Sequence, residues 1–453
     1  MGRTISSEAQ HARMMNQPIP PLVLSICLPT VLSQLISVIY NTADTWYVSQ
    51  ISTEASAAVG IVFSLMAIIQ ALGFGLSMGA GSLISRRLGE KRNEEAHKYA
   101  SSAFAAALLC GTVIAILGLT FLEPLMRLLG STPTILPYAC DYARYILICA
   151  PIMCASFVLS GTLRSEGESD LAMWGLCSGG ILNLILDPVL IFVLKMGIAG
   201  AAIATGISQT VSFTILLSAF LRGKSIVKLS IKHISKSIKD YGLILSTGLP
   251  TIFRQGLASL ASATLNIQAS AYGDAAVAGM TIANKVYILM RNITVGIGQG
   301  FSAVAGYNFG AGNKKRVKQA FKFTCLLGTC VCITVAIVVA LIPENIMGWF
   351  RDDPAVIEAG KNALLFCCAV MPFMAYSTYV NQLLQGLGFK TRATILASSR
   401  QGIFYLPLIY ILPHYLGFTG VQLTQPMADM LTLLVAVPFQ IHFFKKYLKE
   451  SEE

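Results

Sequence analysis

The chain has 453 residues, of which 55% are hydrophobic and only 12% are charged. This composition leaves too little polar surface for an ordinary water-soluble globule, so lipid must solvate most of the chain. The formal net charge of +11 is compatible with a nucleic-acid-binding protein only if the basic residues form a patch, and their placement therefore decides that question.

Long apolar runs follow one another from near residue 20 to near residue 443. Inside hydrocarbon every backbone N–H and C=O needs an internal partner, which leaves helices or closed barrels. The runs show no strand-like alternation, so we predict helices. Twelve spans are predicted, at 20–48, 57–85, 99–122, 135–162, 171–194, 198–221, 242–271, 276–308, 320–342, 356–386, 393–413 and 419–443. The short connections leave no room for a soluble catalytic domain.

The basic residues gather in every second connection, chiefly near 86–98, 222–239, 314–322 and 445–449, and Arg164 is counted with them. Cytoplasmic loops carry an excess of Lys and Arg, so this bias predicts that both termini lie in the cytoplasm. It also explains the net charge without nucleic acid as a partner.

An internal repeat appears when the chain is shifted by 221 residues. Pro29 then meets Pro250, Gln34 meets Gln255, and Pro151 meets Pro372. Each copy holds six spans, so both enter the membrane from the same side, and we expect two parallel six-helix bundles around a central cleft. The predicted division is an N-terminal cytoplasmic tail 1–17, an N-lobe 18–222, a basic cytoplasmic linker 223–240, a C-lobe 241–444 and a cytoplasmic tail 445–453.

Two carboxylates, Asp44 and Asp187, lie at one predicted depth in the N-lobe, and Asn183 and Thr205 share that depth. A charged side chain in the bilayer costs about 2.5 kcal/mol or more, which makes it a functional candidate. Such oxygen ligands suit sodium, or one carboxylate could hold a proton beside its charged neighbour. The alternative is structural: Asp44 caps a helix end and Asp187 ends a turn.

The C-lobe differs in its chemistry. Arg254, Lys285 and Arg291 lie at predicted membrane depth, and Asp429 in the last span is an acid there. These cations could pair with Asp429, line a wet cavity or extend towards the membrane surface. Eleven cysteines lie mostly inside apolar runs without the spacing of a metal site, so we interpret them as packing residues and expect no cofactor.

Several segments resemble the multidrug and toxic compound extrusion (MATE) family, most closely its bacterial MepA-like branch. They are PTVLSQLISVIYNTADTWYVSQ, LGEKRNEEA, LRSEGESDLAMW, NLILDP, GLPTIFRQG and VAGYNFGAGNKKR. The resemblance implies a cation-coupled antiporter for multidrug efflux, driven by protons or sodium, that exports amphipathic and often cationic compounds by alternating access. It assigns cation coupling to Asp44, Asn183, Asp187 and Thr205, and helix bending to Pro29.

The resemblance also implies a substrate cleft between the lobes. Candidate lining residues are Gln34, Tyr40, Met66, Arg254, Gln255, Met290, Tyr307 and Asp429, although ordinary helix packing explains each of them equally well. We expect a monomer, multi-pass in the bacterial cytoplasmic (inner) membrane, with small organic cations and the lipid bilayer as its partners.

Other functions remain open at this point. The basic C-lobe would suit a flippase or exporter of a lipid-linked or anionic precursor. A membrane-embedded enzyme is disfavoured, because the five histidines form no metal-binding pair and no G-x-S-x-G motif occurs. A passive channel fits less well, because kinked repeated lobes with an acid cluster on one side suit coupled exchange.

Overall fold

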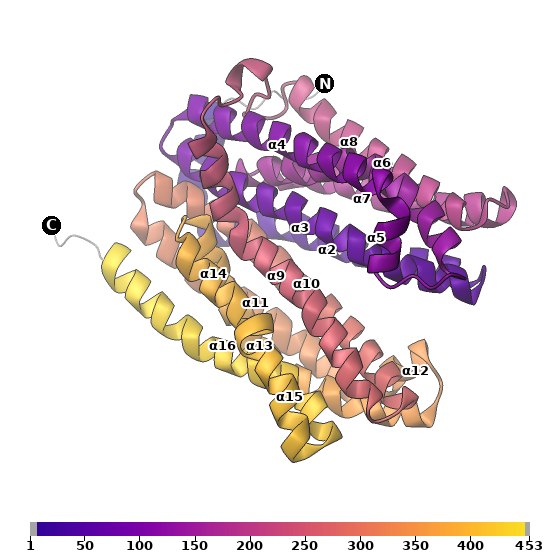
Figure 1. Ribbon diagram of the computed structural model, residues 1–453. Helices are drawn as coiled ribbons and strands as arrows, with labels where there is room; N and C mark the ends of the chain where they lie inside the picture. Colours follow the sequence, from indigo (N-terminus) through magenta and orange to yellow (C-terminus); the bar gives the residue numbers. More distant parts are fainter. Residues whose placement is uncertain (1–6, 449–453) are drawn as a thin grey trace.

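The computed structural model describes residues 7–448, and within that range all regular structure is helical. Parts of the predicted tails 1–17 and 445–453 lie outside the described residues. Figure 1 shows two helical bundles, the N-lobe in indigo to magenta and the C-lobe in salmon to yellow.

Six long helical segments build each bundle. In the N-lobe they are α2 (Ile19–Ser49), α3 (Thr53–Gly89), α4 (Asn93–Thr120), α6 (Leu136–Ser165), α7 (Ser169–Pro188) continued by the π-helical turn η1 (Val189–Val193), and α8 (Gly197–Leu221). In the C-lobe they are α9 (Ile238–Ser270), α10 (Asp274–Gly310), α11 (Lys314–Leu341), α13 (Pro354–Gly386), α14 (Lys390–Ser398) continued through η3 (Ser399–Ile403) into α15 (Tyr405–Leu416), and α16 (Phe418–Tyr447). Shorter helices are α1 (Ser7–Asn16), α5 (Leu122–Leu128), η2 (Ile231–His233) and α12 (Pro343–Phe350).

By length and composition, ten of these segments can cross a membrane. The other two predicted spans, α9 and α10, are 33 and 37 residues long, long enough to cross at 1.5 Å per residue. They are more polar because they carry Arg254, Lys285 and Arg291. The expected all-α membrane fold with two repeated six-helix bundles is confirmed.

The repeat is visible in the backbone. Pro29 lies inside α2 and Pro250 inside the equivalent α9. Gly167 and Gly388 follow α6 and α13 with φ of 92° and 86°, the left-handed conformation in which glycine ends a helix at no steric cost. The two lobes therefore share local geometry as well as helix order.

The lobes contact each other through α3 with α9 and α10 with α2, and also through α3 with α10. We define the linker face as the end of the molecule that carries loops 90–92, 166–168, 222–237, 311–313 and 387–389. There a Cβ added to Gly310 would overlap the carbonyl of Arg86, and one added to Gly89 would overlap the carbonyl of Tyr307. The two contacts are related by the 221-residue repeat, so a pseudo-twofold axis passes between α3 and α10.

The ten-residue helix α1 connects the two lobes across the linker face. Gln10 donates a hydrogen bond from Nε2 to the carbonyl of Glu166 in the N-lobe at 2.8 Å. On the other side, Arg316 of α11 donates from Nη2 to the carbonyls of Met14 and Gln17, at 3.2 and 2.8 Å. These bonds and the glycine contacts close the molecule at the linker face.

The linker between the lobes is fixed to the N-lobe by Glu166. Its Oε2 accepts hydrogen bonds from the Ser225 hydroxyl and from the backbone N–H groups of Ile226 and Val227, each at 3.0 Å. Further along, the backbone N–H groups of Ser230 and Ser235 donate to serine hydroxyls on α4. The linker therefore packs as part of the N-lobe.

We predict that Gly310→Val loosens the linker face. Its new side chain has no room against the carbonyl of Arg86, and overpacking of this kind costs about 1–3 kcal/mol. Thermal unfolding of the purified protein in detergent measures the loss. Gly60→Val is the matched control, because a Cβ at Gly60 meets nothing within 4 Å; equal melting temperatures of the two variants would contradict the tight contact.

A second prediction concerns pH. Burial raises the pKa of the Glu166 carboxyl to about 8, and its hydrogen bonds oppose this only in part. A raised carboxyl pKa means that the unfolded state loses its proton first, so stability is highest below the ordinary pKa and falls as pH rises towards 8. We expect the melting temperature to fall between pH 5 and 8, and to fall less in Glu166→Gln. The exposed Glu8→Gln is the control, and an unchanged slope in Glu166→Gln would refute this assignment.

Candidate functional site

The acid cluster forms as the sequence places it. Asp44 comes from α2, Asn183 and Asp187 come from one face of α7, and Thr205 comes from α8. All four side chains are buried, and Asp187 is fully so. Their common depth follows from helix geometry, because residues four apart on α7 project from the same face.

Hydrogen bonds connect the cluster incompletely. Asn183 donates from Nδ2 to Asp187 Oδ1 at 3.1 Å and lies 3.4 Å from Thr205 Oγ1. Tyr142 of α6 donates its hydroxyl to Asp44 Oδ2 at 3.0 Å. Asp44 and Asp187 are close enough to interact electrostatically.

Three buried oxygens of this cluster have no hydrogen-bond donor within the described part of the chain: Asp44 Oδ1, Asp187 Oδ2 and Asn183 Oδ1. A buried polar atom left without a partner costs about 1–3 kcal/mol, and more when it is charged. All three are hard oxygen acceptors, the type that alkali and alkaline-earth cations and protons prefer. No group of three or more His, Cys, Asp or Glu that could hold a metal occurs among residues 7–448.

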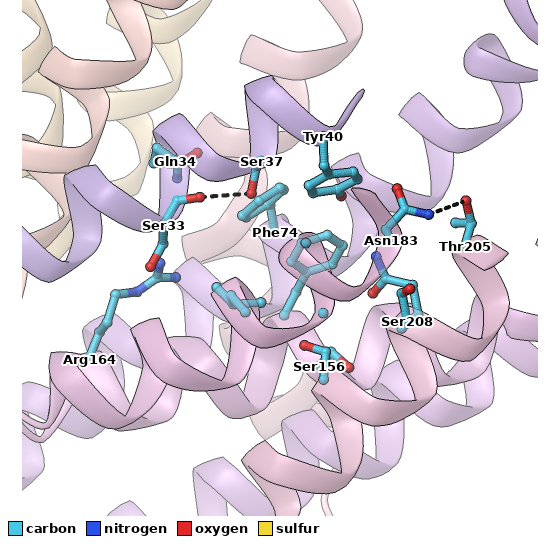
Figure 2. A pocket seen from close by; sticks show the side chains of 16 residues that line it. Ser33, Gln34, Ser37, Tyr40, Phe74, Ser156, Arg164, Asn183, Thr205 and Ser208 are labelled. Atoms are coloured by element: carbon cyan, nitrogen blue, oxygen red, sulfur yellow. Dashed lines mark hydrogen bonds between the residues drawn. The ribbon is translucent and has the colours of Figure 1, made fainter. Parts of the chain in front are cut away.

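A pocket of about 620 Å³ adjoins this cluster inside the N-lobe. Figure 2 shows Asn183 and Thr205 at one end of it and Arg164 beside Ser33 at the other. Tyr40, Phe74 and several serines complete its wall. The cation cluster and the pocket therefore share two residues.

The interpretation of Arg164 as a loop residue is wrong. α6 continues to Ser165, beyond the predicted end of that span at 162, so Arg164 belongs to its last turn. There it is only 5% exposed and lines the N-lobe pocket, and its Nη2 has no hydrogen-bond partner among the described residues.

Between the lobes, a wider cleft of about 910 Å³ opens away from the linker face. Met66, Asn41 and Lys285 are among the residues that line it. A second inter-lobe pocket of about 380 Å³ is lined by Gln34, Arg254 and Gln255, among others. Of the predicted cleft residues, Gln34, Tyr40, Met66, Arg254 and Gln255 line these spaces.

Three predicted cleft residues do not line these pockets. Met290 is buried in α10, and Tyr307 accepts or donates a 3.1 Å hydrogen bond with His11 at the linker face. Asp429 of α16 is buried between two partners: Arg400 donates from Nε to its Oδ1 at 2.6 Å and Tyr287 donates to its Oδ2 at 2.7 Å. Asp429 thus stabilises the C-lobe interior.

A model of the MatE family matches this chain twice, over residues 29–189 and over residues 250–411. The chain belongs to the MatE family. The two matches correspond to the two repeats, and the predicted family is confirmed. As a MatE protein the chain is a multi-pass membrane transporter rather than an enzyme.

Relatives of this MatE protein match it along nearly its whole length. The multidrug export protein MepA of Staphylococcus aureus (strain N315) is 26% identical over 421 residues, covering 93% of each chain. An outward-facing structure of a multidrug resistance MATE family transporter of the MOP superfamily is 27% identical, with a TM-score of 0.89 over 97% of this chain and 99% of that one. A MOP superfamily transporter from Pyrococcus furiosus, for which a reverse polarity of the binding pocket suggests a different function, is 25% identical, with a TM-score of 0.91 and the same coverage of both chains.

Sequence reasoning missed three partners of the acidic residues in this MatE protein. Tyr142, which donates to Asp44, lies in another span, and Tyr287 and Arg400 hold Asp429. The depth of Tyr142 in the membrane could have identified it as a partner of Asp44, because it is the seventh residue of α6, counted from the end opposite the linker face. No comparable signal in a single sequence pairs Arg400 with Asp429.

We predict that Asp429→Asn strongly destabilises the protein. It leaves the guanidinium of Arg400, 11% exposed, without its ion-pair partner, and breaking a buried pair costs about 3–5 kcal/mol. Thermal unfolding in detergent is the measurement, with the exposed α13 residue Glu358 as control in Glu358→Gln. A melting temperature for Asp429→Asn that equals the control would show that the pair contributes little.

Proposed function

We propose that this protein is a cation-coupled multidrug antiporter that exports amphipathic, often cationic compounds by alternating access. The names of its relatives support this proposal. The observation that carries it is the set of three buried N-lobe oxygens that have no hydrogen-bond donor among residues 7–448, in a cluster that shares Asn183 and Thr205 with the N-lobe pocket.

Two residues that the acid cluster shares with the N-lobe pocket can couple cation binding to substrate binding. Asn183 and Thr205 belong both to the acid cluster and to the wall of the N-lobe pocket. Entry of a proton or a sodium ion gives the unpaired oxygens a partner and changes the charge and orientation of that wall. A bound cation and a bound cationic substrate therefore disfavour each other, and this competition allows one to be exchanged for the other.

Alternation between two states fits the inter-lobe contacts. The molecule is closed at the linker face by α1 and the glycine contacts and open at the opposite end through the wide cleft. Pro29 lies inside α2 about four turns before Asp44, and a proline removes a helix hydrogen bond and permits bending. We propose that α2 bends when the cation cluster changes its occupancy, and that this bending closes the wide cleft.

We further propose that the linker face is cytoplasmic, because the basic stretches gather there. Both termini then lie in the cytoplasm of a bacterial cell and the wide cleft faces outward across the inner membrane. The division into an N-lobe 18–222, a linker 223–240 and a C-lobe 241–444 is kept with this orientation, and we propose a monomer.

We predict that Asp44→Asn and Asp187→Asn each abolish gradient-driven export. An amide cannot release a proton and binds sodium more weakly than a carboxylate, so the cation no longer drives the exchange. Ethidium movement in proteoliposomes under an imposed proton gradient, and separately under a sodium gradient, measures this and identifies the coupling ion.

The control for both variants is Asp141→Asn, which changes an exposed acid of α6. Export that persists in both cluster variants at normal protein levels would refute the proposed coupling site. Loss of export with the gradient and substrate binding intact would support it.

The alternative function is a flippase or exporter of a lipid-linked or anionic precursor. Arg254 and Arg291 in the inter-lobe pocket are the observation that favours it. The same proteoliposomes, with fluorescent phosphatidylglycerol in place of ethidium, separate the two functions: a gradient-dependent change in lipid sidedness without ethidium export would favour the alternative.

A further inference from the structure

The inter-lobe pocket of about 380 Å³ contains two arginines that no part of the proposed cation coupling uses. We call it the arginine pocket. It is lined by Gln34, Phe74, Thr251, Arg254, Gln255, Arg291, Asn292, Val295 and Gln299. Apart from Phe74 and Val295, every lining side chain is polar, which is unusual inside a membrane bundle.

Neither arginine has an acidic partner. Among residues 7–448, no Asp or Glu forms an ion pair with Arg254 or Arg291, and neither guanidinium donates a hydrogen bond within that part of the chain. Arg254 instead interacts electrostatically with Arg291 and Arg400, both of them cations. Asp429 attracts Arg291 electrostatically, but within the described residues it forms no ion pair with Arg291 or Arg254.

The nearest acid, Asp429, is already occupied. Arg400 donates to its Oδ1 and Tyr287 to its Oδ2, and Gln425 donates to Oδ1 at 3.1 Å as well. Asp429 thus forms its ion pair with Arg400, and among residues 7–448 no carboxylate forms an ion pair with Arg254 or Arg291. Guanidinium groups form forked hydrogen bonds with carboxylate and phosphate oxygens, which makes an oxyanion their natural partner.

The remaining walls suit the same ligand. The side-chain amides of Gln255, Asn292 and Gln299 supply N–H donors around the two guanidiniums. Phe74 and Val295 provide apolar contact for a hydrocarbon or aromatic body. Asn292 also lines the wide cleft, so the arginine pocket adjoins an open route.

We propose that the arginine pocket binds the phosphate or carboxylate group of an amphipathic molecule, with Arg254 and Arg291 as its two charged ligands. The site belongs to the C-lobe side of the cleft, and the acid cluster belongs to the N-lobe. The protein then holds separate places for a cation and for an anion. Only the role of this anion as cargo rests on the proposed export function; its binding does not.

Binding of dodecyl phosphate to the purified protein in maltoside detergent tests the proposal. Dodecyltrimethylammonium has the same chain with a cationic head, and inorganic phosphate has the head without the chain. We expect dodecyl phosphate to raise the melting temperature and to bind saturably, and dodecyltrimethylammonium not to compete with it. Inorganic phosphate that binds equally well would identify a free oxyanion as the ligand, and selective binding of dodecyl phosphate an amphipathic one.

Variants assign the binding to the two arginines. Arg254→Gln and Arg291→Gln should each weaken dodecyl phosphate binding by about tenfold or more, since each removes a charge-assisted pair. Arg254→Lys and Arg291→Lys keep the charge and should lose less, which separates loss of the ligand from misfolding. Lys285→Gln removes one positive charge from the wide cleft and is the matched control.

Asp187→Asn separates this proposal from the export function. It should lose coupled export and still bind dodecyl phosphate. Wild-type protein that does not bind dodecyl phosphate, or folded Arg254→Gln and Arg291→Gln variants that bind it as well as Lys285→Gln does, would overturn the arginine pocket as an anion site.

Discussion

The absence of water in the bilayer core is the constraint on which the whole molecule depends. Backbone groups meet it by forming helices, and most side chains meet it by being apolar. Polar side chains that stay buried must find partners in the protein, as Asp429 does with Arg400 and Tyr287. Those that do not are the informative ones. Among residues 7–448, three oxygens of the acid cluster have no hydrogen-bond donor, and the two guanidiniums of the arginine pocket form no ion pair.

The two lobes share their backbone geometry, but their buried polar side chains differ. The repeat supplies equivalent prolines in α2 and α9 and equivalent close contacts at Gly89 and Gly310. Such a scaffold can rock about its pseudo-twofold axis. The chemistry placed on it differs, because Asp44 and Asp187 belong to the N-lobe, whereas Arg254 and Arg291 belong to the C-lobe. The N-lobe also holds Arg164, whose Nη2 has no hydrogen-bond partner in the described part of the chain.

The sequence was sufficient for the spans, the repeat and the membership of the acid cluster, because hydropathy, spacing and helical depth are local properties. It was insufficient wherever a side chain finds its partner in another span. Tyr142 beside Asp44 and Arg400 beside Asp429 depend on helix packing that no single-sequence pattern encodes. Arg164 was predicted in a loop for a related reason. A charged residue near a helix end is normally exposed to water, and only the helix packing shows that this last turn faces a pocket.

The hydrogen bonds of the linker with Glu166 and with α4 limit how the two lobes can move relative to each other. Residues 225–235 move with the N-lobe because their backbone is held there. Lys98 of α4 also pairs with Asp240, at 3.1 Å, in the first turn of α9. Ser235 donates to Asp240 and accepts hydrogen bonds from Ser237 N–H and the Tyr241 hydroxyl, so these bonds span residue 236. The start of α9 is therefore also tied to the N-lobe, and the covalent connection between the lobes is held at both of its ends.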